Sequence, residues 1–147
     1  MKQMYALVLF LTCAFFYATA GTALAEDLTI TAENRAELLA DTVWEGAYVS
    51  RSPNGGQVRF ESDVTLTFNG DASQADWHFT EGNKTFSAGD VSVENGNIIL
   101  GIDFEPRAFQ LRNDDGDTVM ETEYEYMFQN EWPREVNVTL RRSATTN

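Results

Sequence analysis

From Val43 onward, apolar and polar residues alternate along the chain, and turn-forming segments interrupt the alternation about every ten positions. A strand with this period has one apolar face and one polar face, because successive side chains point to opposite sides. The segment 57–68 is a clear example, with an inward set of Val58, Phe60, Ser62, Val64, Leu66 and Phe68. The repeated pattern predicts an all-β sandwich or barrel.

Eight segments of the chain have this strand pattern, and short links join them. Short links pair each strand with the next in an antiparallel meander. Because an open sheet would leave two unpaired edges, we predict an eight-stranded antiparallel up-and-down barrel, with an open sandwich as the alternative. The segments are 43–50, 57–68, 75–80, 84–93, 97–104, 107–112, 117–128 and 134–142.

Two local features refine this plan. Residues 31–40 predict one short helix, with Thr31 as its N-cap, that plugs or flanks one end of the barrel. In the fourth segment the apolar parity switches across Gly89-Asp90. A β-bulge at Gly89 would explain this switch.

The first 25 residues have the pattern of a secretory signal peptide. Lys2 precedes an apolar run, and a small-residue stretch then predicts cleavage before Glu26, with cleavage after Ala20 as the alternative. The apolar run is short for a retained membrane anchor, so we expect no membrane span after processing. We therefore expect a periplasmic or extracellular protein with a β-barrel domain at 26–142 and a disordered tail at 143–147.

The chain is strongly acidic, with a formal net charge of −13, and this surface repels nucleic acid. Glu121, Glu123 and Glu125 form an outward row that is either a solvated face or a docking face for a basic protein. An outer-membrane barrel would instead bury these glutamates in its lumen, which is costly. Its third and sixth strands would also be shorter than the roughly 9 residues that a spanning strand needs.

The segment LLADTVWEGAY, residues 38–48, places a tryptophan early in the first strand, and arginines end the last strand. This arrangement resembles the calycin superfamily, the lipocalins and their small bacterial relatives. In lipocalins a Gly-x-Trp motif opens the first strand, and an arginine packs across that tryptophan. Trp44 matches the tryptophan and Arg142 the arginine, whereas Thr42 stands where the motif has glycine. The resemblance implies a barrel that binds apolar molecules or inhibits proteases.

An eight-stranded barrel either fills its interior with side chains or holds one small ligand. The many inward rings here support filling, whereas the tyrosine hydroxyls support a ligand cavity, because buried hydroxyls need partners. We expect a non-enzymatic binding protein for a small apolar or aromatic ligand. The alternative is a filled barrel that acts through its surface as a hydrolase inhibitor or an envelope protein-interaction module. The predicted ligand-binding residues are Trp44, Tyr48, Phe60, Phe104, Tyr124 and Tyr126.

The sequence shows no constellation of base, nucleophile and metal ligand, so we expect no enzyme, no cofactor and no metal site. His78 is the only histidine, and its parity is opposite to that of Trp77 and Phe79, so it points outward. Asn113, Asp115 and Asp117 have alternate spacing like that of a calcium loop. A hairpin with an acidic turn is the preferred interpretation of that segment.

Overall fold

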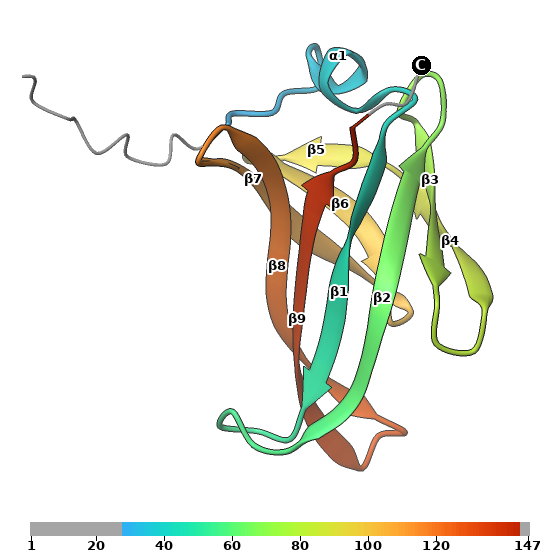
Figure 1. Ribbon diagram of the computed structural model, residues 1–147, viewed down its shortest axis with the longest axis vertical. Helices are drawn as coiled ribbons and strands as arrows, with labels where there is room; N and C mark the ends of the chain where they lie inside the picture. Colours follow the sequence, from blue (N-terminus) through green and yellow to red (C-terminus); the bar gives the residue numbers. More distant parts are fainter. Residues whose placement is uncertain (1–27, 145–147) are drawn as a thin grey trace, which may run out of the picture.

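The structure is a computed structural model that describes residues 28–144. In this range the chain forms one short helix and nine strands in a single antiparallel sheet, with the order β4-β3-β2-β1-β9-β8-β7-β6-β5 (Figure 1). The prediction of an all-β, up-and-down arrangement is therefore confirmed. The elements are α1 Arg35–Leu39, β1 Val43–Arg51, β2 Val58–Phe68, β3 Gln74–Phe79, β4 Lys84–Asp90, β5 Ser92–Glu94, β6 Asn97–Ile102, β7 Glu105–Asp114, β8 Asp117–Phe128 and β9 Trp132–Arg142.

The predicted number of strands was wrong by one, because the fourth predicted segment forms two strands. β4 pairs with β3 and β5 pairs with β6, and Val91 lies between them. The pairing register shifts at Ala88, which is an extra residue in β4, and Gly89 follows it with a φ of +73°. The bulge predicted at Gly89 is therefore present. It bends the chain away from one neighbouring strand and toward the other.

β4 and β5 are the two ends of the strand order, yet they are consecutive in the chain. The sheet therefore curls into a nearly closed barrel. At the remaining gap β4 and β6 come close together, because a Cβ added to Gly101 would lie 2.9 Å from the carbonyl oxygen of Ala88. The indole Nε1 of Trp77 on β3 donates a hydrogen bond to the carbonyl oxygen of Gly101, at 2.9 Å, and joins the two sides of the gap.

Helix α1 covers one end of the barrel (Figure 1). It begins at Arg35 with Asn34 as its N-cap, and not at the predicted N-cap Thr31; Thr31 and Asn34 exchange two hydrogen bonds across the turn that precedes the helix. Leu39 is fully buried, and the Arg35 guanidinium donates to the carbonyl oxygen of Val91 at 2.9 Å. The helix is thus tied to the junction of β4 and β5.

The barrel half next to α1 is filled by side chains. The inward positions that alternation predicts are buried there on strands from all sides of the barrel. Trp44 and Trp77 are the largest of the fully buried residues. The remaining core includes Val64, Leu66, Phe68, Ile98, Leu100, Ile102, Phe109, Val136, Val138 and Leu140.

At the opposite end, β1, β2, β8 and β9 run beyond the other strands (Figure 1). β3 pairs with β2 only from Val64 onward, and β7 pairs with β8 only as far as Glu121. The remaining parts form an open four-stranded sheet whose inner face is incompletely covered. This explains why Val58 and Phe60, both predicted to point inward, are 38% and 39% exposed, and why Phe128 on β8 is 42% exposed. We refer to this region as the open end.

No helix within residues 28–144 is long and apolar enough to cross a membrane. The predicted signal peptide, residues 1–25, lies outside the described residues. Of the predicted tail, Ser143 donates its backbone N–H to the carbonyl oxygen of Val43 at 2.8 Å, and 145–147 lie outside the described range.

Candidate functional site

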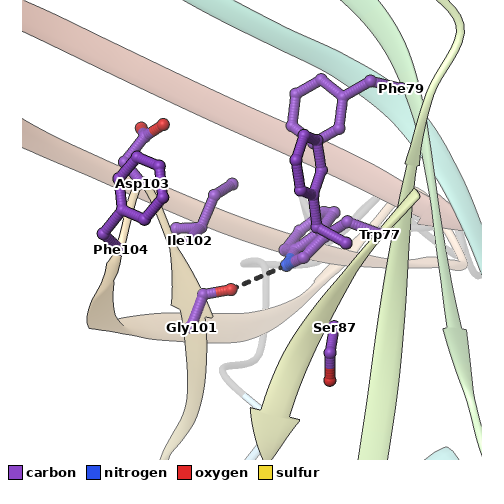
Figure 2. Close-up of a pocket in the computed structure, with 8 residues that line it drawn as sticks. Trp77, Phe79, Ser87, Gly101, Ile102, Asp103 and Phe104 are labelled. Carbon is purple, nitrogen blue, oxygen red and sulfur yellow. Dashed lines mark hydrogen bonds between the residues drawn. The ribbon is translucent and has the colours of Figure 1, made fainter. Parts of the chain in front are cut away.

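A cleft lies at the open end, between the β3–β4 hairpin and the turn that joins β6 to β7. One hollow of about 380 Å³ is lined by Trp77, Phe79, Phe86, Ser87, Gly101, Ile102, Asp103 and Phe104. Figure 2 shows Asp103 and Phe104 on one side of it and Trp77 and Phe79 on the other. A second hollow of about 390 Å³ shares Phe79, Phe86 and Asp103, and adds Tyr48, Phe60, Glu81, Gly82 and Lys84. We call the two together the aromatic cleft.

Four rings of the aromatic cleft pack edge to face. The Tyr48 ring centroid lies 5.8 Å from that of Phe60, at 69°, and 5.3 Å from that of Phe79, at 65°. The centroids of Phe79 and Phe86 are 5.8 Å apart at 82°. Aromatic pairs prefer such near-perpendicular contacts. The arrangement turns ring faces in different directions, so that the cleft has walls of aromatic π surface.

A carboxylate lies among these rings and is held by two tyrosines. The hydroxyls of Tyr48 on β1 and Tyr124 on β8 both donate to Oδ2 of Asp103, at 2.7 Å and 2.5 Å. Burial, followed by the negative charge of Asp103, raises the pKa of both tyrosines far above the ordinary value near 10. Both hydroxyls therefore remain protonated donors, and they fix the carboxylate in place.

Two further side chains support Tyr124. The ring of Tyr126 lies 6.3 Å from it, and burial raises the pKa of Tyr126 as well. The Arg107 guanidinium lies 4.3 Å above the Tyr124 ring, which is a cation–π contact. Glu105 forms an ion pair with Arg107 at 2.5 Å. Tyr124 is thus held between a ring and a paired cation.

Asp103 and Phe104 reach the cleft because they form a two-residue turn. Ile102 pairs with Glu105, and both turn residues have positive φ, +52° and +67°. A turn of this kind matches the twist of the flanking strands but favours Asn, Asp and Gly. Phenylalanine is strained at positive φ, and Phe104 is fully exposed. The prediction that Phe104 points into the barrel was therefore wrong, although it does line the mouth of the cleft.

The structure brings five of the six sequence-predicted ligand residues to the open end. Tyr48, Phe60 and Phe104 line the aromatic cleft, Tyr124 joins it through Asp103, and Tyr126 packs beside Tyr124. They meet because β1, β9 and β8 are neighbours in the sheet, so inward positions of β1 and β8 share one face.

Trp44 lies in the barrel half next to α1, where it is fully buried, and it does not line the cleft. Its indole Nε1 donates to Oγ1 of Thr42 at 2.8 Å, and this hydroxyl donates to the carbonyl oxygen of Leu39 at 2.6 Å. Thr42 thus links the tryptophan to α1 where the lipocalin motif has glycine. Arg142 is the register partner of Trp44 but is exposed, and no cation–π contact joins the two in the described part of the chain.

Asp103 was not among the predicted site residues, although it is the polar centre of the cleft. It comes from the turn between β6 and β7, whereas Tyr48 lies on β1 and Tyr124 on β8, and strand parity gives no information about a partner in a turn. One signal was present in the sequence: a carboxylate that ends an apolar strand, within a two-residue link that lacks glycine.

The other polar and charged side chains that the sequence singled out have a structural role. Asp115 and Gly116 form the predicted hairpin turn, with φ values of +51° and +90°. Beside this turn Asp114 pairs with Arg141 at 2.8 Å. Residues 28–144 contain no group of three or more His, Cys, Asp or Glu side chains that could hold a metal ion. His78 lies on the outer face, with Nδ1 3.2 Å from Oγ1 of Thr85.

Comparison of the chain with protein-family models, with curated proteins and with solved structures found no match. The fold is compatible with a calycin-like barrel.

Proposed function

We propose that this protein is a secreted, lipocalin-like binding protein that holds a small apolar or aromatic ligand in the aromatic cleft, without catalysing a reaction. The observation that carries the proposal is a cleft walled by rings around one fixed carboxylate. Ligand sites are usually apolar hollows of roughly 300–1,000 Å³ with a few convergent polar groups. The first hollow, at about 380 Å³, falls in this range.

The sequence left a filled barrel and a ligand cavity as alternatives, and the proposal assigns the filled interior to the half next to α1 and the ligand to the open end. The half next to α1 is packed with side chains and gives the cleft a rigid base. The open end leaves rings exposed, and Phe86 is 49% exposed on the cleft wall. A ligand that covers an exposed ring in a concave site removes apolar surface from water, and this burial favours binding.

Native mass spectrometry tests this function directly. The protein is expressed from its full sequence, and we expect the recovered chain to begin at Glu26. We expect an added mass either on isolation or after incubation with a panel of lipids and aromatic compounds. A bare mass throughout would overturn the ligand-binding proposal.

A matched pair of variants locates the ligand. Phe86→Ala removes a wall of the cleft, and Phe128→Ala removes a similarly exposed ring outside it. Phe86→Ala should weaken binding about tenfold or more, because burying a phenylalanine contributes on the order of 1.5–3 kcal/mol. Phe128→Ala should leave the affinity unchanged. Equal losses in both variants would place the ligand elsewhere.

The second candidate function is a surface-acting hydrolase inhibitor or envelope protein-interaction module. It is favoured by exposed apolar side chains on the β8–β9 hairpin, where Met127 is 53% and Trp132 is 55% exposed. Exposed apolar patches often mark protein–protein interaction surfaces. Under this alternative Trp132→Ala abolishes inhibition or partner binding, whereas Phe86→Ala does not. The outward row Glu121, Glu123 and Glu125 remains a candidate face for a basic partner.

A further inference from the structure

The two oxygens of the Asp103 carboxylate differ in their hydrogen bonding within residues 28–144. Oδ2 accepts both tyrosine hydroxyls, whereas Oδ1 has no hydrogen-bond partner among residues 28–144. Asp103 lines both hollows of the aromatic cleft. No ion pair to Asp103 is present in the described range either. An unpaired carboxylate in a partly buried, aromatic site favours a positively charged partner.

The tyrosine hydroxyls that face this carboxylate already donate their hydrogen bonds to it. Tyr48 and Tyr124 donate to Oδ2, and their raised pKa keeps them protonated. Arg107 is held by Glu105 and lies above the Tyr124 ring. Trp77 donates to the carbonyl oxygen of Gly101, and the other donors in the lining, Lys84 and Ser87, make no hydrogen bond to Asp103. A donor on a ligand can therefore bind Oδ1 of Asp103 without displacing a donor of the protein.

The ring walls favour the same ligand charge. The faces of Tyr and Phe rings carry negative potential, and a cation near several faces is attracted to them. Tyr48, Phe60, Phe79 and Phe86 supply such faces in different directions around the cleft. The net charge of the chain, −13, also attracts cations and repels anions over longer distances.

We propose that the ligand of the aromatic cleft is an amine, whose ammonium group binds Oδ1 of Asp103 while its apolar part packs against the surrounding rings. This inference rests on the proposed function, because it names the chemical class of ligand for the same site.

A matched series of three compounds tests the inference on the unmodified protein. 4-Phenylbutylamine, 4-phenylbutanol and 4-phenylbutyrate share a ring and a chain length and differ in the charge of the head group. Titration calorimetry at neutral pH should show the amine binding roughly tenfold to hundredfold more tightly than the alcohol, since hydrogen bonds to charged groups contribute that much. The butyrate should bind most weakly.

Asp103→Asn assigns the preference to one side chain. Asparagine keeps an oxygen for the tyrosines, tolerates the positive φ, and replaces the other oxygen with a donor. The amine should lose its advantage over the alcohol. Asp76→Asn makes the same change at an exposed position on the outer side of β3, and should keep that advantage. Circular dichroism confirms that each variant is folded.

The outcomes separate the two proposals. If all three compounds bind equally, the cleft binds ligands but the amine inference is wrong. If the amine preference survives Asp103→Asn, the charge recognition lies elsewhere and the inference is also wrong. If none of the three binds, the inference is overturned, and a bare native mass across the wider panel then overturns the proposed function as well.

Discussion

Phe104 is the residue at which backbone strain and the candidate site coincide. Its φ of +67° is costly for a bulky residue, and its side chain is fully exposed, so no burial within the described chain compensates for the strain. Strain of this kind is found preferentially at functional sites. A ring held at the mouth of the aromatic cleft at the expense of stability is consistent with a role in ligand contact.

Phe104→Gly should therefore stabilise the protein and weaken ligand binding. Relief of about 1–2 kcal/mol of strain exceeds the roughly 0.5–1 kcal/mol of entropy that glycine costs, so the free energy of unfolding should rise by up to about 1 kcal/mol. Urea denaturation measures the change. Phe128→Gly, at an exposed strand position, is the control and should destabilise. A loss of stability in Phe104→Gly would contradict the strain argument.

Tyr48, Tyr124 and Tyr126 are the only tyrosines within residues 28–144, so absorbance of the processed protein reports on this cluster alone. Their pKa values are raised in the folded state by burial. Stability is therefore complete below the unfolded pKa of about 10, and it falls as the pH rises above that value, because Tyr48 and Tyr124 ionise there only in the unfolded state. We expect the tyrosinate absorbance of these two residues to appear cooperatively, together with unfolding. Gradual ionisation of all three tyrosines near pH 10 with intact circular dichroism would exclude the buried network.

The gap between β4 and β6 interrupts the strand pairing of the barrel wall, and Gly101 lies on it. A Cβ at Gly101 would contact the backbone of Ala88 at 2.9 Å and disturb the carbonyl that Trp77 binds. We expect Gly101→Ala to reduce the free energy of unfolding by about 1–3 kcal/mol, as overpacking does. Gly70→Ala is the control, since its nearest atom, in Asp41, is at an ordinary 3.4 Å. Thermal unfolding compares the two, and equal melting temperatures would show that the gap can widen without cost.

Alternation predicted the strands well, because one-sided burial imposes a period of two on the sequence. It placed Val64 and Leu66 in the core, and a parity switch located the bulge at Gly89. It did not predict that β4 and β5 are separate strands, because no local pattern records a change of pairing partner. It extended the core face to Phe104 because the link between β6 and β7 lacks the usual glycine or asparagine signal.

The sequence allowed the tyrosines of the candidate site to be predicted, but not the aspartate that two of them bind. Tyr48, Tyr124 and Tyr126 could be grouped because they lie on strands whose parity and order follow from short links. Asp103 could not be added, because its meeting with these tyrosines depends on how far the barrel curls. Closure of a sheet depends on twist and strand length, which a single sequence does not specify.

The fold as a unit combines a closed, filled half with an open half that has fewer strand neighbours. Beyond Glu121, β8 pairs only with β9, and before Val64, β2 pairs only with β1. Edge strands with an incompletely covered face open locally at lower free energy than a packed core. The aromatic cleft, our proposed ligand site, thus adjoins the part of the barrel that we expect to deform most easily.

Amide hydrogen exchange should reveal this division. Amides at 119–121 and 137–141 should exchange only on global unfolding, whereas those at 124–132 should exchange through local openings that cost a few kcal/mol less. A ligand in the aromatic cleft should slow exchange at 124–128 and leave the closed half unchanged, because it stabilises only the state in which Tyr124 holds Asp103. Uniform protection in the ligand-free protein would mean that the two halves unfold as one unit. Ligand-induced protection confined to 119–121 would place binding inside the closed half, against the geometry of the cleft.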